Sequence, residues 1–253
     1  MADDVPEMTA GLPALPPAIV GAFGGRWWNE GRAPLERLQL ARTRVPLANG
    51  GGRRVVLVTG YLDGGDGSRP LVDWLRRAGY GVDVAKMRGN VGASSTGVER
   101  IEQTLHGGDQ GPAILIGHSR GGQLARVAAL RNPELVEQLI TLGAPVRAHL
   151  PRNAVLRASV EVLRLIHQLP FGPTLDRQEN TRYEADLFAP FDVDVAWTTI
   201  WSKSDGVVEW QTCLDDRARS IEVSTSHIGL IASVASFRAI ASVLDRTRFG
   251  RDG

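Results

Sequence analysis

The segment Gly117-His118-Ser119-Arg120-Gly121 has the residue types and spacing that could make a serine act as a nucleophile. An apolar run from Ala113 to Gly117 precedes the serine, and a helical pattern from about Gly121 to Arg131 follows it. A nucleophilic serine must project from a tight strand-to-helix turn, which small residues two positions before and after it allow. The same five residues also occur in ordinary glycine-rich turns, but their placement between a strand and a helix favours a nucleophile.

A serine hydroxyl needs a histidine base within hydrogen-bond reach, and His227 is the best candidate among five histidines. It follows the last predicted strand and precedes the last predicted helix, where a loop at the carboxyl edge of a parallel sheet would hold it. The other histidines lie inside the serine turn, at a helix end or in an inserted segment: His118, His106, His149 and His167. The alternative interpretation of His227 is a surface histidine that caps a helix.

The base in turn needs a carboxylate to orient it, and Asp205 is the leading candidate. It lies in Ser204-Asp205-Gly206-Val207-Val208, a turn that follows the penultimate predicted strand. Other acids lie at the opposite end of that strand or in a solvated turn: Asp192, Asp194, Asp215 and Asp216. The chain order is therefore serine, acid, histidine, which differs from the order in chymotrypsin and in subtilisin.

Acyl transfer also requires two backbone N–H donors for the tetrahedral oxyanion. One is expected from Arg120, the residue after the nucleophile. The other is expected from Tyr61, because Thr59-Gly60-Tyr61 ends the first predicted strand. An ordinary strand-to-loop turn is the alternative at that position.

The elements that must position these residues alternate between strands and helices after Gly50, which predicts an α/β fold with a mostly parallel central sheet. The predicted strands are Val55–Thr59, Gly81–Ala85, Ala113–Gly117, Leu135–Leu142, Val193–Trp201 and Ser220–Val223. The predicted helices are Pro70–Ala78, Val98–Leu105, Gly121–Arg131 and Ile228–Leu244. The sheet and its flanking helices form one domain over residues 53–253.

Two segments interrupt this alternation. Residues from about 147 to 190 are predicted as a helical cap or lid, with a helix over Ala148–Gln168 and a polar, turn-rich stretch over Pro170–Pro190. Residues 1–52 are predicted as an irregular leader that packs on the core, in which Leu35, Leu38 and Leu40 form the apolar face of a short helix. Contact of that helix with a membrane surface is the alternative.

Composition narrows the classes of function. The formal charge is +1 and the arginines are scattered among acids, so no nucleic-acid footprint is expected. Cys213 is the one cysteine, which excludes a disulfide within the chain. The acidic start, Met1-Ala2-Asp3-Asp4, is atypical of a secretory signal, and no apolar run reaches the roughly 18 residues of a membrane span. We therefore expect a soluble, cytoplasmic protein.

The serine, acid and histidine segments together resemble the α/β-hydrolase superfamily, and within it bacterial lipase-like and esterase-like serine hydrolases. The resemblance covers roughly Arg53 to Leu244, and it departs from the lipase pattern at Thr59, where those lipases usually have histidine. It implies a sheet of eight strands or slightly fewer, an insertion after the sixth strand, and no metal or organic cofactor. It also implies hydrolysis of a small or lipid-like acyl ester through an acyl-enzyme on Ser119.

Several alternatives stay open on sequence alone. The same three residues serve thioesterases, amidases, lactonases and acyltransferases, and a binding protein can keep the fold without the reaction. A lipase docked on a membrane through the leader is a further alternative. Apolar residues of the insertion line an acyl pocket in one interpretation and only pack on the core in the other: Leu156, Leu163, Leu165, Ile166 and Phe171.

Overall fold

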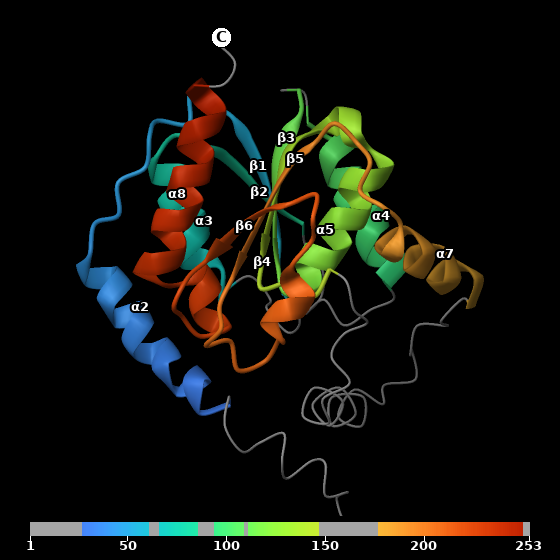
Figure 1. The fold of residues 1–253 in the computed structure, drawn as a ribbon. Helices are drawn as coiled ribbons and strands as arrows, with labels where there is room; N and C mark the ends of the chain where they lie inside the picture. Colours follow the sequence, from blue (N-terminus) through green and yellow to red (C-terminus); the bar gives the residue numbers. More distant parts are fainter. Residues whose placement is uncertain (1–26, 61–65, 86–93, 109–110, 147–176, 250–253) are drawn as a thin grey trace, which may run out of the picture.

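The computed structural model describes residues 27–60, 66–85, 94–108, 111–146 and 177–249 (Figure 1). Within them, six parallel strands form one sheet in the order β2-β1-β3-β4-β5-β6. The strands are β1 (Arg54–Val58), β2 (Gly81–Ala85), β3 (Ala113–His118), β4 (Val136–Leu142), β5 (Ala196–Trp201) and β6 (Arg219–Glu222). The predicted α/β class and parallel sheet are confirmed.

The strand order reverses between β1 and β3, because β2 lies on one side of β1 while β3 to β6 follow on the other. In open parallel sheets, ligand sites form outside the carboxyl ends of the strands where the order reverses. Ser119 directly follows β3, so the topology places it at such a point.

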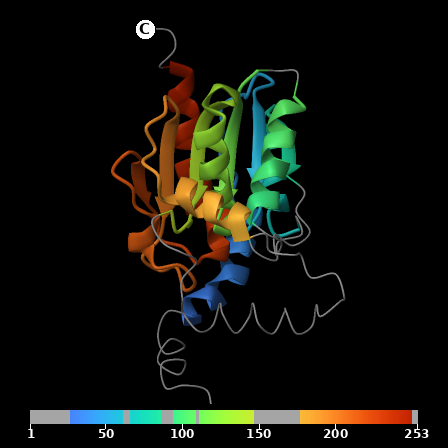
Figure 2. The ribbon, with the colours of Figure 1, turned by 90° about the vertical axis from the view of Figure 1, so that its right-hand side faces the viewer.

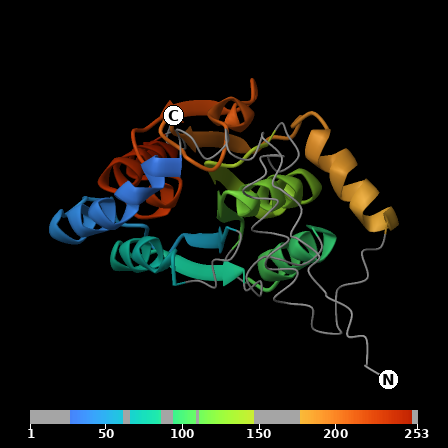
Figure 3. The ribbon, with the colours of Figure 1, turned by 90° about the horizontal axis from the view of Figure 1, so that it is seen from below.

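Helices cover both faces of the sheet (Figure 3). One layer contains α4 (Ser94–His106), α5 (Arg120–Arg131) and α7 (Arg177–Phe188), and the other contains α3 (Arg69–Arg77) and α8 (Val234–Phe249). Successive residues of β1 face opposite layers: Val56 and Val58 join one core cluster, while Val55 and Leu57 join the other. Because both faces are covered, β1 and β3 are buried along their whole length.

The inserted segment differs from its prediction in two ways. It follows β4, the fourth strand of the described sheet, instead of a sixth. The stretch expected to be turn-rich contains α7, which runs from Arg177 to Phe188. The predicted helix over 148–168 lies outside the described residues, so a cap over the site stays a prediction.

Tertiary contacts explain why a polar sequence forms α7. Tyr183 and Leu187, four residues apart on one face of the helix, are buried in the core cluster beside α4 and α5. The buried guanidinium of Arg126 donates hydrogen bonds to the carbonyl oxygens of Asp186, Leu187 and Ala189. Those carbonyls lie at the carboxyl end of the helix, where backbone acceptors have no partner within it.

The leader contains a 3-10 helix, η1 (Trp27–Arg32), that continues into α2 (Ala33–Arg42), at the lower end of the molecule in Figures 1 and 2. The predicted apolar face is wrong for two of its three leucines, since Leu35 and Leu38 are 57% and 45% exposed. The helix buries Ala33 and Glu36 instead. No helix in the described part of the chain is long and apolar enough to cross a bilayer.

The predicted closing helix is divided in two. The 3-10 helix η4 (Ile228–Ile231) is followed by α8, which begins at Val234. Between them, the Ser233 hydroxyl accepts a hydrogen bond from the Ser236 N–H at 3.2 Å. A serine in this place caps the helix that follows it, so α8 starts there and η4 remains attached to the His227 loop.

Candidate active site

Ser119 occupies a strained turn between β3 and α5. Its backbone angles are φ 54° and ψ −127°, and it is the one non-glycine residue with positive φ in the described part of the chain. Its N–H donates to the carbonyl of Leu142 at the end of β4, and its own carbonyl accepts from the Gly122 N–H. Backbone strain of this kind persists where the surrounding structure holds it, often at functional sites.

The glycines around the serine are required by close packing. A Cβ atom on Gly117 would lie 2.5 Å from the Cα of Gly122, and one on Gly121 would lie 2.4 Å from the carbonyl oxygens of Val58 and Thr59. Real side chains do not approach backbone atoms so closely. The small residues on either side of Ser119 therefore let α5 begin directly against β1 and β3.

His227 and Asp205 are in direct contact. The Nδ1 of His227 lies 2.7 Å from the Oδ2 of Asp205, and the two residues are 6% and 2% exposed. The other carboxylate oxygen of Asp205 accepts the N–H groups of Val207 and Val208. Asp205 follows β5 and His227 follows β6, so both come from loops at the carboxyl edge of the sheet.

Two opposing effects act on the imidazole. Burial lowers the pKa of His227, but the charge and hydrogen bond of Asp205 and the charge of Glu30 raise it, and the net pKa lies above the ordinary value. Behind the acid, burial followed by the charge of Asp205 raises the pKa of the Cys213 thiol. The buried thiol therefore stays protonated at neutral pH.

The end of β4 brings the serine and the His–Asp pair to one place. Leu142 accepts the Ser119 N–H, and the next residue, Gly143, faces the pair: a Cβ there would lie 3.1 Å from Asp205 Oδ2 and 3.4 Å from His227 Nδ1. Among the described residues, no hydrogen bond joins the Ser119 hydroxyl to His227. Catalytic hydrogen bonds are often long before substrate binds, so this geometry is compatible with a serine–histidine pair.

Of the two expected oxyanion donors, one lies within the described residues and the other does not. Arg120 is the first residue of α5, where the helix dipole and N-terminal amides favour a nearby negative charge. Tyr61 lies outside the described residues, so its role stays a prediction.

The other sequence candidates lie elsewhere or outside the described residues. Asp192 is exposed and forms an ion pair with Arg217, while Asp215 accepts the Arg217 N–H in a turn. His106 ends α4, as expected. His149 and His167 lie outside the described residues.

His118 lies beside His227, although its sequence position indicates a weaker candidate. Its ring centroid lies 4.7 Å from that of His227, and its Nε2 lies 3.1 Å from the His227 carbonyl oxygen. The feature of the sequence that indicates this contact is the position of His118 directly before Ser119. Glu30 also reaches the site, and nothing in its own segment indicates that it contacts residues almost 200 positions away.

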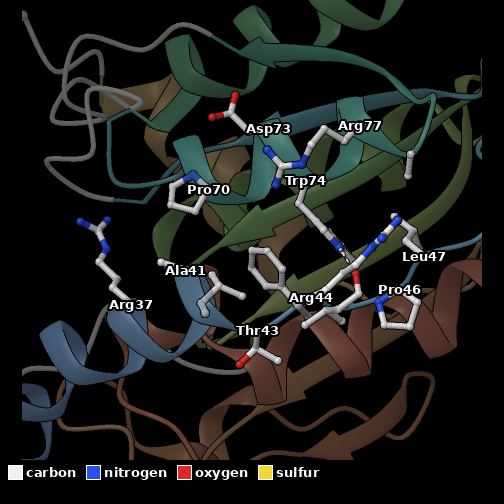
Figure 4. A pocket seen from close by; sticks show the side chains of 14 residues that line it. Arg37, Ala41, Thr43, Arg44, Pro46, Leu47, Pro70, Asp73, Trp74 and Arg77 are labelled. Carbon is white, nitrogen blue, oxygen red and sulfur yellow. Dashed lines mark hydrogen bonds between the residues drawn. The ribbon is translucent and has the colours of Figure 1, made fainter.

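A cavity of about 780 Å³ lies apart from these residues, between α2 with the segment that follows it, α3 and α8 (Figure 4). Trp74 and Phe237 contribute to its walls, and Arg37, Arg44 and Arg77 lie along it. Ser119, Asp205 and His227 do not line it. We place the candidate chemistry at the strand ends, because the polar groups able to react converge there.

Comparison with known proteins supports the fold. A family model described as the α/β-hydrolase fold matches residues 53–168. No curated protein sequence matches the chain. The chain therefore has the α/β-hydrolase fold, as the matched residues and the parallel sheet together show.

Solved structures of the same fold include a metagenomic carboxyl esterase, which is 14% identical with a TM-score of 0.58 over 83% of this chain and 80% of that one. Another is the mouse α/β hydrolase domain-containing protein 10, which is 18% identical with a TM-score of 0.55 over 82% of this chain and 93% of that one. A third is the thioesterase domain from the curacin biosynthetic pathway, which is 16% identical with a TM-score of 0.51 over 79% of this chain and 93% of that one. At such identities the likeness shows the fold alone.

Proposed function

We propose that the protein is a serine hydrolase that cleaves carboxylic esters through an acyl-enzyme on Ser119. One observation carries the proposal most directly. The buried 2.7 Å contact between His227 Nδ1 and Asp205 Oδ2 lies at the sheet edge where Ser119 projects from its strained turn. A histidine oriented by a buried carboxylate beside a strained serine is the arrangement that nucleophilic acyl transfer requires.

In the first half of the proposed reaction, the Ser119 hydroxyl attacks the ester carbonyl while His227 Nε2 accepts its proton. Asp205 holds the Nδ1–H and stabilises the imidazolium that forms. The N–H of Arg120, with that of Tyr61 as the predicted second donor, stabilises the tetrahedral oxyanion. Collapse of this intermediate expels the alcohol, which takes its proton from His227.

In the second half, water attacks the acyl-enzyme and His227 again accepts the proton. Collapse of the second tetrahedral intermediate breaks the acyl bond to the Ser119 oxygen, which takes the proton back from His227, and the acid product leaves. Because the base acts in its neutral form and the pKa of His227 is raised, we expect kcat/KM to rise as the pH passes through that raised value.

The ester preference is the finer part of the proposal. The fold is shared with a carboxyl esterase and with a thioesterase domain, and the same three groups attack either kind of carbonyl. Parallel assays with p-nitrophenyl esters of increasing chain length, acyl thioesters and acyl anilides separate the classes. Faster turnover of thioesters or anilides than of matched esters would contradict ester hydrolysis while leaving the nucleophile in place.

Labelling with a fluorophosphonate probe tests the nucleophile itself. We expect the wild-type protein to be labelled and to hydrolyse p-nitrophenyl esters, and Ser119→Ala to lose labelling and roughly 10⁶-fold in turnover. Ser242→Ala is the matched control, because the Ser242 hydroxyl donates within α8 to the carbonyl of Ala239, away from the site. An unlabelled wild-type protein, or undiminished labelling of Ser119→Ala, would overturn the proposal.

A further inference from the structure

Two acidic residues of the leader contact the loops that carry the acid and the base. Glu30, in η1, accepts hydrogen bonds from both loops through one carboxylate oxygen: from the Gly206 N–H at 2.9 Å and from the His227 N–H at 2.8 Å. Its other oxygen lies 3.2 Å from the N–H of Ile228. One carboxylate thus joins the residue after Asp205 to the backbone of the base.

Glu36, on α2, contacts the residue before the base. It is 6% exposed, and its carboxylate accepts the Ser226 hydroxyl at 2.5 Å and the Ser226 N–H at 3.1 Å. Space for it depends on Gly229, where a Cβ atom would lie 2.2 Å from a Glu36 carboxylate oxygen. The carboxylate and the glycine therefore fit together in one packed arrangement.

These contacts satisfy the amino end of η4. The N–H groups of Ser226, His227 and Ile228 precede or begin that short helix, and each donates to a leader carboxylate. Donors at a helix start have no acceptor within the helix, and charge-assisted hydrogen bonds are stronger than neutral ones. The backbone that carries the imidazole is thereby fixed by residues almost 200 positions earlier in the chain.

We propose that Glu30 and Glu36 are positioning residues that hold the His227 loop, and through Glu30 also the Asp205 loop, in the geometry needed for proton transfer. The inference rests on the proposed function, and it assigns a role in the reaction to a leader that lies outside the matched residues 53–168. Glu30 fixes the separation between acid and base because it contacts both loops. Glu36 fixes the base loop alone.

The two acids differ in their electrostatic effect on the base. The charged or titratable groups that face His227 are Asp205 from the loop after β5, Glu30 from η1 and His118 from β3. The charge of Glu30 contributes to the raised pKa of His227, whereas Glu36 is not among the contributing groups. Neutralising Glu30 should therefore lower the pKa of His227, and neutralising Glu36 should leave it unchanged.

The test uses the full-length chain with Glu30→Gln, Glu30→Ala and Glu36→Gln. Glu134→Gln is the control, because it removes an exposed carboxylate from the α5–β4 connection at the far end of the sheet. Steady-state hydrolysis of a p-nitrophenyl ester gives kcat and KM, and NMR of labelled histidine follows the His227 titration and its Nδ1–H resonance. Circular dichroism verifies folding.

We expect Glu30→Ala to lower kcat by roughly 10- to 100-fold with little change in KM, because displacement of a catalytic group by about 1 Å has effects of this size. Glu30→Gln should show a smaller loss of kcat and a lower His227 titration midpoint. Glu36→Gln should lower kcat without moving that midpoint. Glu134→Gln should match the wild type in every measurement.

Wild-type kcat in both Glu30 variants would overturn the positioning role, and so would a shifted His227 titration with no loss of kcat. If Glu30→Ala does not fold, the nearly isosteric Glu30→Gln decides the question. Failure of the proposed function has a different signature, since an unlabelled and inactive wild-type protein would contradict the hydrolase itself. In that case the Nδ1–H resonance still reports whether Glu30 holds the His227 loop: a resonance unchanged in Glu30→Ala would overturn the contact.

Discussion

The turn around Ser119 and the loop around His227 are built in different ways. The turn around Ser119 is built from one contiguous motif, since β3 precedes it, α5 follows it, and Gly117, Gly121 and Gly122 allow the close approach to neighbouring strands. His227 is held by Asp205 and by two leader residues, Glu30 and Glu36, which are distant in sequence. A short motif therefore builds the turn around Ser119, while long-range carboxylate contacts hold the loop of His227.

The difference indicates where the site tolerates change. A turn stabilised by glycine packing and strand pairing is part of the buried core. Substitutions in it should therefore mainly lower the stability of the protein. A loop held by charge-assisted hydrogen bonds is different. Substitutions that remove those bonds should mainly change the position of His227 or its pKa. Substitutions in the two regions should therefore separate stability from activity.

The largest effect is expected from Asp205→Asn, which removes the strongest partner of the base. We expect kcat to fall on the order of 10⁴-fold, because the amide disfavours the productive histidine tautomer. Loss of the Asp205 charge removes the larger of the two charges that raise the pKa of His227, while burial still lowers that pKa and Glu30 still raises it. The pKa should therefore fall, and the acid limb of the residual kcat/KM profile should move to lower pH. Asp192→Asn, at an exposed ion pair, is the control and should retain wild-type rates.

The next largest effect is expected on stability. It tests whether close packing of glycines holds the turn around Ser119. Gly121→Ala should lower the free energy of unfolding by about 3 kcal/mol, because its Cβ would lie 2.4 Å from two backbone carbonyl oxygens. Chemical denaturation measures the change. Gly81→Ala, where the nearest atom lies at an ordinary 3.8 Å, should change it far less. Equal losses in both variants would show that close packing does not control the turn.

A third substitution tests whether contacts between distant residues also stabilise α7 in the inserted segment. Arg126→Leu removes three hydrogen bonds to the end of α7, and we expect a loss of about 2 kcal/mol with faster amide exchange in α7. Arg131→Leu is the matched comparison, since it removes more exposed ion pairs, with Asp186 on the same helix and with Glu102 on α4. Its effect should be smaller, below about 1 kcal/mol. The reverse ranking would contradict a stabilising role for Arg126.

The smallest effect concerns the exposed face of the leader helix. Leu35→Ser combined with Leu38→Ser should change stability by less than about 0.5 kcal/mol, because both side chains are substantially exposed. Leu40→Ser, in a residue that packs against the core cluster, should be more destabilising. A large loss in the double variant would show that the leucines, and not Ala33 and Glu36, attach the helix to the domain.

Much of the fold could be predicted from local patterns. The runs over Val55–Thr59 and Ala113–Gly117 are apolar and fully buried in β1 and β3, because a parallel sheet covered on both faces selects continuous apolar strands. The helix α7 could not be predicted in the same way, since its polar sequence is stabilised by Arg126 from another helix. The packing of the leader helix is not predictable from hydrophobicity for a related reason. Hydrophobicity favours burial of Leu35 and Leu38, while the domain offers the Ser226 donors that bind Glu36.

By itself the sequence determined the parallel sheet, the turn that presents Ser119 and the order of serine, acid and histidine along the chain. Each depends on residues next to one another, or on the rule that parallel strands end at a common edge. The tertiary structure decided which carboxylate meets His227, that His118 packs beside it, and that Glu30 and Glu36 hold its loop. The reason is physical: hydrogen bonds and electrostatic contacts depend on distances in space, and for these groups sequence separation carries no information about those distances.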